Sequence, residues 1–385
     1  MKKLTVGVIF GSRSTEHDVS IITALASIIK PLELSGQYEV VPIYIDKQGR
    51  WFSDDKLKDV TLYSSGDIRA YLEKQKPLLL SIGGGFSITK PGLKPKSIKL
   101  DVVFPATHGT HGEDGELMGL LEMAGVPYVG CDMPSSVLSM DKALAKVVTS
   151  SQGIPTSRFV WFYAKDFNAD TSNILTDIGK LKFPLFVKPV HLGSSIAISR
   201  VKDQKELVNA IEVAAHYDDK IIVEEAVENL IEVTVPIIGN DSPKPAMVEQ
   251  PLVTSEDFFD FDTKYMRGGK KGKGSKQSGA QGYSNIPADI SSDLYRKSEQ
   301  TALQVYGALG CKGTARVDLL IDSKTKTVYF NEVNPLPGSL YAHNWRKAGK
   351  SGVQLVDDLI NLALERNAER IKNTTTFDTN YLKQY

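Results

Sequence analysis

The amino-acid sequence predicts an α/β protein with two or three domains. At 385 residues and 42.3 kDa, the chain is long enough to form more than one hydrophobic core. Its N-terminal third alternates β-rich apolar runs with a helical run, which is typical of a parallel sheet with helices on its faces. Near the C-terminus, two short strands carry charged residues where apolar ones are expected. We therefore expect a parallel-sheet domain, a small α/β domain and a charged C-terminal hairpin.

The composition excludes several classes of protein. Lys+Arg and Asp+Glu both total 46, so the net charge is zero and bulk charge supports binding to neither nucleic acid nor a membrane. We expect no transmembrane helix, because no apolar run is long enough, and the run from Leu4 to Phe10 is too short for a signal peptide. Cys131 and Cys311 are far apart in the sequence, which indicates neither a disulfide framework nor a zinc site and fits a reducing cytoplasm.

The first elements are predicted from apolar spacing. Leu4–Phe10 is a buried strand, and Val19–Ile29 is a helix with Ser14 or Thr15 as its N-cap. Val40–Ile45 and Asp101–Pro105 supply further strands of the sheet. Ligands of such sheets bind beyond the carboxyl ends of the strands.

Two loops follow strand ends and carry polar residues. Glu16 lies in the first loop, where it has a functional role or simply favours the helix N-terminus through the helix dipole. The second loop contains His108 and His111 among three glycines. His-x-x-His without softer ligands is a poor zinc site, so a glycine-rich substrate loop is the better interpretation. The segment 47–99 is expected to form edge strands and surface loops without a site.

The middle of the chain predicts a smaller α/β unit. A boundary at 128–134 precedes a helix at 135–151 that carries Lys142, which alone would be interpreted as a solvated lysine. The strand at 183–190 contains Lys188, and burial of its ammonium group would be costly without a partner. The following loop, 192–195, is an ordinary hairpin loop or a phosphate-binding one, since its backbone N–H groups could surround an anion.

The charged hairpin consists of strands at 314–321 and 327–334. Side chains alternate between the faces of a strand, so Arg316 and Asp318 share one face, and Glu332 and Asn334 share the corresponding one. Two carboxylates and an amide oxygen suit Mg²⁺ held together with phosphates, with Arg316 beside them for an anion. The alternative is an amphipathic hairpin with a solvated face. A helix at 291–309 is expected to pack behind the hairpin, and a final helix at 353–366 to close the domain.

Several segments, in order from Glu16 to Gly338, resemble the D-alanine:D-alanine ligase family of ATP-grasp enzymes. They are EHDVS from Glu16, HGTHGEDG from His108, SMDK ending at Lys142, FVKPVHLGSS from Phe186, FFDFDTKY ending at Tyr265, ARVDLL from Ala315, NEVN from Asn331 and PLPG ending at Gly338. The resemblance implies an ATP-grasp fold with an N-terminal Rossmann-like substrate domain (1–134), a central lid domain (135–227) and a C-terminal α+β metal-binding catalytic domain (228–385).

The resemblance also implies a function. It is the ATP-dependent joining of two D-alanines into D-alanyl-D-alanine through an acyl phosphate, for peptidoglycan precursor synthesis in the cytoplasm. Two Mg²⁺ ions, for which Mn²⁺ can substitute, and a homodimer are implied too, with neither nucleic acid nor membrane as a partner. The alternative within the class is a ligase with another acceptor, such as D-lactate or D-serine. A nucleotide-binding regulatory protein is disfavoured by the intact hairpin charges, and a Rossmann oxidoreductase by the missing glycine fingerprint.

Residue roles follow from the same resemblance. The catalytic set is Glu16, Ser194, Tyr265, Arg316 and Gly338; the substrate-binding set is His108, Lys264, Ser339 and His343; the ATP-binding set is Lys142, Lys188, Ser195, Glu224, Glu225, Val227 and Glu232; and the metal ligands are Asp318, Glu332 and Asn334. Glu16, Ser194 and Tyr265 would lock a loop over the site.

Two segments depart from the family pattern. The segment before Glu232 is one residue shorter, and Glu232 is the candidate for the ribose hydroxyls. After Gly338, His343 stands near the place of a serine that binds the acceptor carboxylate. The Gly/Lys-rich segment 266–282 is expected to be a mobile surface loop.

Overall fold

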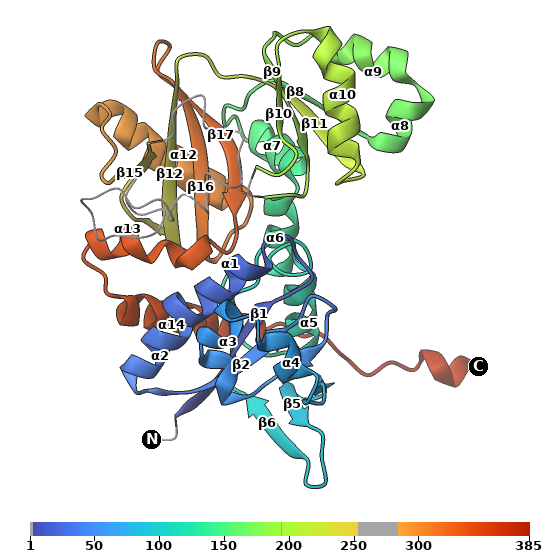
Figure 1. Cartoon of the computed structure of the whole chain (residues 1–385), viewed down its shortest axis with the longest axis vertical. Helices are drawn as coiled ribbons and strands as arrows, with labels where there is room; N and C mark the ends of the chain where they lie inside the picture. Colours follow the sequence, from blue (N-terminus) through green and yellow to red (C-terminus); the bar gives the residue numbers. More distant parts are fainter. Residues whose placement is uncertain (1–2, 194, 253–283) are drawn as a thin grey trace.

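In the part of the chain that the structure describes, three four-stranded sheets are accompanied by helices, by a three-stranded sheet and by a two-stranded sheet (Figure 1). The computed structural model describes residues 3–193, 195–252 and 284–385. In the view of Figure 1, the N-terminal sheet lies at the bottom, the central sheet at the upper right and the C-terminal sheet at the upper left. This arrangement confirms the predicted α/β class with one mainly parallel sheet and antiparallel sheets elsewhere.

The N-terminal sheet has the strand order β3-β2-β1-β7. Its elements are β1 (Leu4–Gly11), α1 (His17–Ile22), the π-helix η1 (Thr23–Ile29), α2 (Lys30–Ser35), β2 (Tyr38–Ile45), β3 (Trp51–Phe52), the 3₁₀-helix η2 (Asp55–Lys58), α3 (Thr61–Ser64), α4 (Ile68–Leu72), β4 (Leu79–Ser81), β5 (Phe86–Lys90), β6 (Lys96–Leu100), β7 (Val102–Pro105) and α5 (Glu116–Ala124). β1 pairs in parallel with β2 and β7, so the loops after β1 and β7 emerge side by side. In the segment 47–99, the prediction of an edge strand is confirmed for β3, which pairs with β2, whereas β4, β5 and β6 form a separate antiparallel sheet and η2, α3 and α4 are helices that were not predicted.

The first helix begins earlier than its apolar pattern indicates. It starts at His17, and its N-cap is Glu16, so the prediction of Ser14 or Thr15 was wrong. The cause is His17, which is buried with one ring nitrogen 2.6 Å from the Ser12 carbonyl oxygen and the other 2.9 Å from the Tyr44 hydroxyl. These contacts hold the side chain of His17 in place, so the helix begins two residues before Val19.

Two helices, where one was predicted, connect the N-terminal and central sheets. α6 (Met133–Met140) and α7 (Lys142–Ser151) are separated by Asp141, which is in an extended conformation. The Asp141 side chain accepts a hydrogen bond from the Leu144 amide at 2.8 Å and thereby caps α7. The cap places Lys142 at the start of a new helix, where its side chain is buried rather than solvated.

The central sheet is antiparallel at every described pairing, with the order β10-β9-β11-β8. Its elements are β8 (Phe159–Tyr163), α8 (Ala164–Ala169), α9 (Thr171–Ile178), β9 (Leu185–Pro189), β10 (Ser199–Val201), α10 (Gln204–Ala215) and β11 (Lys220–Glu225). Leu185 and Val187 of β9 pack into the core under the helices. Since side chains alternate, Lys188 points to the opposite face.

The C-terminal sheet has the order β13-β12-β16-β17 and contains the predicted hairpin. Its elements are β12 (Leu230–Gly239), β13 (Lys244–Pro245), β14 (Gln250–Pro251), β15 (Ser284–Asn285), α12 (Ser292–Ala308), β16 (Gly313–Asp322), β17 (Thr327–Asn334), the 3₁₀-helix η5 (Gly338–Tyr341), α13 (Ala342–Lys347), α14 (Gly352–Arg370) and the 3₁₀-helix η6 (Tyr381–Gln384). Ala315, Val317 and Leu319 share a core with α12, which confirms that this helix packs behind the hairpin.

The last long helix, α14, packs against both the N-terminal and the C-terminal part of the chain. Leu355, Leu359 and Ile360 are buried together with Val6 and Phe10 of β1. The same core also contains Leu340 and Trp345 from the C-terminal part, so α14 packs between the N-terminal sheet with α2 on one side and β16 and α13 on the other. The domain boundaries stay predictions.

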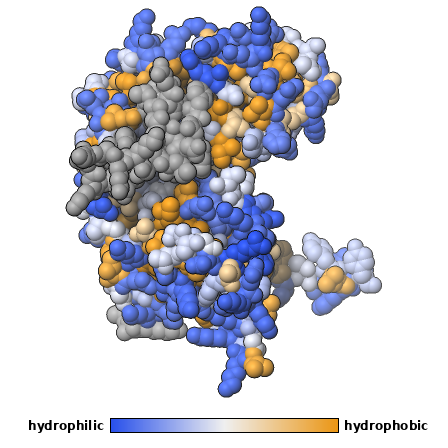
Figure 2. Space-filling model, viewed as in Figure 1, coloured by the Kyte–Doolittle hydropathy of each residue, from blue (hydrophilic) through white to orange (hydrophobic). Residues whose placement is uncertain are grey.

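The surface seen in Figure 2 is largely hydrophilic, with hydrophobic residues near the waist between the upper and lower parts. Both cysteines are buried and free. Within residues 3–193, 195–252 and 284–385, the structure contains no helix long and apolar enough to cross a membrane.

Candidate active site

The charged residues of the hairpin meet on one face of the C-terminal sheet. In the β16–β17 register, Arg316 is opposite Asn334 and Asp318 is opposite Glu332. A register shift between Asp318 and Leu319 marks the end of the charged part of the ribbon. Neighbouring antiparallel strands bring opposed side chains within about 5 Å of each other. The structure thus brings together all three predicted metal ligands and Arg316.

Asp318 is held by three side chains. Arg316 donates to both of its carboxylate oxygens, from Nε at 2.8 Å and from Nη2 at 2.6 Å, and the Thr234 hydroxyl donates to Oδ1 at 2.5 Å. Asn334 Nδ2 lies 3.2 Å from Oδ2. Burial alone would lower the pKa of Arg316, but the Asp318 carboxylate raises it well above its ordinary value. The bidentate pair fixes the guanidinium in one orientation and leaves Nη1 outside the pair.

Lys142 connects the hairpin with the loop after β9. Its Nζ lies 3.5 Å from Glu332 Oε2 and donates to the Leu192 carbonyl oxygen at 2.7 Å. The carbonyl belongs to the predicted phosphate loop, and the carboxylate belongs to the predicted metal site. The two predicted sites are therefore adjacent, with a buried ammonium group between them.

Lys188 lies on the face of the central sheet opposite the core with α10, and its side chain is 12% exposed. Its Nζ is 2.5 Å from Glu224 Oε1, so the buried lysine of the sequence has the partner that it requires. Glu225 Oε1 accepts hydrogen bonds from Arg158 Nη1 at 3.1 Å and from the Lys182 amide at 2.9 Å. Val227 lies in the connection from β11 to β12. Glu232 is on β12, opposite Leu320.

Glu16 reaches two glycine loops at once. A β-carbon added to Gly109 or to Gly193 would lie 3.0 Å from Glu16 Oε2, so the carboxylate packs closely against both glycines; at Gly109 the Ser14 hydroxyl would be closer still, at 2.5 Å. The first loop follows β7 and the second follows β9. Glu16 therefore lies where the N-terminal and central parts of the chain meet, and it directly adjoins the predicted phosphate loop.

His108 and Ser339 are brought together by a third residue. The Ser339 amide donates to Thr23 Oγ1 at 2.9 Å, and the same hydroxyl lies 2.9 Å from His108 Nε2. Burial lowers the pKa of His108 to about 4, so the imidazole is neutral at neutral pH. Thr23 lies inside η1 and escapes detection in the sequence, because a threonine in an apolar helical run resembles any core position.

Glu113 connects the loop after β7 with the turn after β17. It is buried, and it accepts hydrogen bonds from the Gly109 amide at 2.9 Å and from the Leu336 amide at 3.2 Å. Burial, followed by the nearby charge of Glu16, raises the pKa of Glu113 to about 8. This glutamate therefore ties the histidine loop to the turn that follows β17.

The donor set of the hairpin fits Mg²⁺. Asp318 and Glu332 supply carboxylate oxygens and Asn334 an amide oxygen, all hard ligands, and no described cysteine or histidine belongs to the group. A second acidic group, formed by His191, Asp218 and Asp219, is also compact. However, hydrogen bonds to Asp141 and Asp218 raise the pKa of His191 to about 9. A metal ion would have to displace the proton of this ring, whereas the hairpin ligands carry none to displace, so we assign the metal to the hairpin.

Comparison with known proteins agrees with this geometry. A family model described as "D-ala D-ala ligase N-terminus" matches residues 5–131, and one described as "D-ala D-ala ligase C-terminus" matches residues 148–361. The chain belongs to the D-alanine–D-alanine ligase family. A curated D-alanine–D-alanine ligase from Chlorobium phaeovibrioides is 38% identical over 379 residues, covering 95% of this chain and 98% of that protein.

Two solved structures support the fold of the family. The D-alanine–D-alanine ligase from Coxiella burnetii has a TM-score of 0.79 and 29% identity, with 97% of each chain covered. The VanG D-Ala:D-Ser ligase from Enterococcus faecalis has a TM-score of 0.77 and 31% identity, covering 94% of this chain and 100% of that one. These likenesses confirm the predicted ATP-grasp fold.

The segment that departs from the family pattern has an unusual backbone. Ser339, Leu340 and Tyr341 have φ angles of 51°, 52° and 50°, the left-handed region that residues with a side chain rarely adopt. Each such residue costs on the order of 1–2 kcal/mol. The turn is held by Ser339 through Thr23 and by Tyr341, whose ring lies 5.0 Å from the Arg316 guanidinium. Backbone strain of this kind is common at ligand sites.

His343 follows this turn and is paired. Its Nε2 lies 3.0 Å from Glu249 Oε2, and Asn344 Nδ2 donates to the same oxygen at 3.0 Å. Burial alone would raise the pKa of Glu249, but the contacts with His343 and Asn344 lower it. Sequence reasoning singled out His343 but missed Glu249, which is 94 residues away and has no recognisable motif around it.

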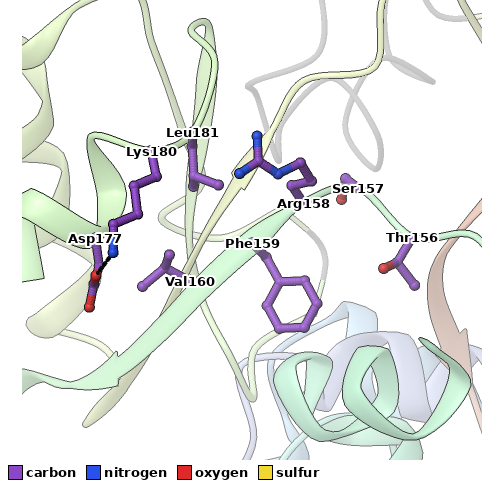
Figure 3. Close-up of a pocket in the computed structure, with 8 residues that line it drawn as sticks. All are labelled: Thr156, Ser157, Arg158, Phe159, Val160, Asp177, Lys180 and Leu181. Atoms are coloured by element: carbon purple, nitrogen blue, oxygen red, sulfur yellow. Dashed lines mark hydrogen bonds and ion pairs between the residues drawn. The ribbon is translucent and has the colours of Figure 1, made fainter. Parts of the chain in front are cut away.

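Three predicted residues, Ser194, Lys264 and Tyr265, lie outside the described residues, as does the segment 266–282. A cavity of about 360 Å³ lies beside the first residues of β8 (Figure 3). It is lined by Thr156 to Val160 and by Asp177, Lys180 and Leu181, and thus by none of the predicted site residues. We therefore do not assign the reaction to it.

Proposed function

We propose that this chain joins two D-alanines into D-alanyl-D-alanine at the expense of ATP, for peptidoglycan precursor synthesis. One observation carries the proposal: Lys142 lies between the carboxylates of the hairpin and the loop after β9. The phosphates of ATP and the metal ions bound to them require metal-binding carboxylates and a phosphate-binding loop next to each other. The reaction itself is inferred from the family. The relatives named above act on D-alanine by their names, which supports the same substrate.

The ATP-binding residues would act chiefly by position and charge. Asp318, Glu332 and Asn334 would hold two Mg²⁺ ions, for which Mn²⁺ can substitute, and such ions neutralise charge that develops on phosphate oxygens during transfer. Lys142 and Lys188 would contact phosphate oxygens, and Ser195 would contribute to the phosphate loop. Glu224, Glu225 and Val227 would border the adenine, and Glu232 the ribose.

The first D-alanine would bind with its ammonium group near Glu16 and its carboxylate towards the ATP phosphates. The carboxylate attacks the γ-phosphorus, the bond to the β–γ bridging oxygen breaks, and ADP leaves. Glu16, Ser194 and Tyr265 would form a hydrogen-bonded lock that keeps water from the acyl phosphate. The position of Glu16 against Gly193, next to Ser194, supports its part in the lock.

The amine of the second D-alanine would then attack the acyl carbon. The oxyanion of the tetrahedral intermediate would be met by Arg316 and by the backbone N–H of Gly338, and its collapse releases phosphate. His108, neutral at neutral pH, would face the substrate as a hydrogen-bonding group. Lys264, Ser339 and His343 would bind the carboxylate of the acceptor.

A second acceptor requires the same test, because the Glu249–His343 pair places a carboxylate and an imidazole beside the strained turn. D-Serine or D-lactate would place a hydroxyl there. A homodimer and a cytoplasmic location are part of the same proposal by family resemblance, and light scattering of the purified protein tests the first.

The test of the function is direct. Purified protein is incubated with Mg-ATP, D-alanine and, in turn, D-serine or D-lactate, and the product is identified by mass spectrometry together with ADP release. We expect D-alanyl-D-alanine as the main product. If D-alanine fails as acceptor while another acceptor works, the product assignment is wrong and the ligase class stands; ADP release with no ligated product refutes both.

A further inference from the structure

A second lysine of α7 is buried more deeply than any predicted site residue that the structure describes. Lys146 is 0% exposed and lies one helical turn after Lys142, on the same side of the helix. No motif of the sequence includes it, and a buried ammonium group costs several kcal/mol unless partners compensate it. Its presence at the junction of α7, β11 and β17 therefore requires a reason.

The contacts of Lys146 use its whole hydrogen-bonding capacity. Its Nζ lies 3.0 Å from Glu224 Oε2 and donates at 3.3 Å to both the Ser157 hydroxyl and the Phe330 carbonyl oxygen. An ammonium group has three N–H donors, so none is left for a ligand. Lys146 therefore acts on the site through its neighbours.

The neighbour that matters is Glu224, because it is shared by two lysines. Its Oε1 lies 2.5 Å from Lys188 Nζ, while Oε2 accepts from Lys146 and, at 2.6 Å, from the Ser157 hydroxyl. Burial alone would raise the pKa of Glu224, but the two lysines hold it well below its ordinary range, so the carboxylate is ionised.

The charges of this group are unequal. Two ammonium groups surround one carboxylate, which leaves one positive charge. The Lys146 side chain is 1% exposed and that of Lys188 is 12% exposed, so the excess charge can reach a ligand only through Lys188. Without Lys146, Glu224 and Lys188 would form a neutral pair, and the Ser157 hydroxyl would add no charge to it.

We propose that Lys146 is a positioning residue for the nucleotide phosphates. It neutralises the Glu224 carboxylate at Oε2, the oxygen that does not face Lys188, so that the Lys188 ammonium group stays available to a phosphate oxygen. This inference rests on the proposed function in one respect, the contact between Lys188 and ATP phosphate. It assigns Lys146 no contact with the nucleotide.

The test compares ligands with and without phosphates. Lys146→Met should weaken binding of the non-hydrolysable analogue AMPPNP with Mg²⁺ by about 10- to 100-fold, the range seen when a residue that orients a ligand-binding group is removed. Adenosine, which has no phosphate, should lose much less affinity than AMPPNP, and its loss measures how far the change disturbs Glu224 beside the adenine. Calorimetry measures both, so a failure of ligase activity does not affect the outcome. In the active enzyme, KM for ATP should rise more than kcat falls.

Two further variants separate positioning from stability. Lys146→Arg keeps the charge and should stay within about fivefold of the wild type, half of the smallest loss expected for Lys146→Met. In the Glu224→Gln background, Lys146→Met should have little further effect on AMPPNP, because the carboxylate that captures Lys188 is gone. If Lys146→Met does not fold, Ser157→Ala, which removes another contact of Glu224 Oε2, should give a smaller loss, again greater for AMPPNP than for adenosine.

The control is Lys58→Met. Lys58 is also paired with two carboxylates, Glu33 at 3.0 Å and Asp55 at 3.1 Å, but on the N-terminal part of the chain. This variant should leave both affinities unchanged. Three results would overturn the proposal. Lys146→Met could weaken the binding of AMPPNP and adenosine equally, or weaken neither. It could also weaken AMPPNP binding by the same factor in the wild-type and Glu224→Gln backgrounds.

Discussion

Glu332→Gln is the sharpest test of the hairpin, because activity and stability should respond differently. The change removes one negative charge and keeps the shape of the side chain. We expect a loss of about 10²- to 10³-fold in kcat, the range seen when a group that stabilises transition-state charge is deleted. Half-saturation by Mg²⁺ should move to higher concentration, which a titration of turnover against Mg²⁺ measures.

The expected change in stability is small. At the observed 3.5 Å between Lys142 Nζ and Glu332 Oε2, the gross attraction is about 5 kcal/mol at an effective dielectric constant of about 20. Glu332 is 30% exposed, so solvent screening and desolvation reduce the net value to about 1 kcal/mol. Lys142 also keeps its hydrogen bond to Leu192. Thermal unfolding should therefore shift by about 2 °C.

The matched control lies on the neighbouring strand of the same hairpin. Asp322, at the far end of β16, accepts hydrogen bonds from the Lys324 amide at 2.8 Å and from the Thr325 amide at 3.2 Å in the turn. Asp322→Asn should therefore reduce stability slightly and leave turnover unchanged. Near-normal activity of Glu332→Gln at ordinary Mg²⁺, or an equal loss in Asp322→Asn, would refute the assignment of the metal site.

Three further predictions use other parts of the site. Because the pKa of Glu113 is raised from 4.5 to about 8, the native state binds more protons than the unfolded one between these values. The free energy of unfolding should fall as pH rises from about 4.5 to about 8. Urea unfolding at several pH values measures this dependence, and Glu113→Gln should abolish it. His343→Ser should raise KM for the acceptor and leave KM for ATP unchanged; equal acceptor kinetics would exclude its contact with the acceptor. Tyr265→Phe should raise the ADP released per dipeptide formed, and an unchanged ratio would count against the lock with Glu16.

The sequence predicts best those features that depend on neighbours in the chain. Alternation along two adjacent strands was enough to place Arg316 and Asp318 on one face and to oppose them to Asn334 and Glu332, since both the pleat and a short turn are local properties. The same reasoning identified Lys188 as a buried charge in need of a partner. The partner itself, Glu224, is 36 residues away, and its sequence context indicates a strand end and no ion pair.

The residues that escaped prediction share a different property, because their roles exist only after distant segments meet. Thr23 joins Ser339 to His108 across 316 and 85 residues of sequence, and Lys146 meets the carbonyl oxygen of Phe330 across 184. A threonine or a lysine on an amphipathic helix has many ordinary uses, so nothing local distinguishes these two. The early start of α1 at His17 has the same cause, because the Tyr44 hydroxyl that helps to fix it belongs to another strand.

The two lysines predicted for the phosphates differ in how their partners can respond to a ligand. Lys142 is paired with Glu332, which is 30% exposed and can turn towards solvent or a cation when an anion approaches the lysine. Lys188 is paired with Glu224, which is 2% exposed and cannot lose a partner without leaving a buried charge uncompensated. A second buried lysine resolves this difficulty, because Glu224 keeps Lys146 and Ser157 whatever Lys188 does. The unequal burial of the two carboxylates therefore explains why one predicted phosphate lysine needs a buried companion and the other does not.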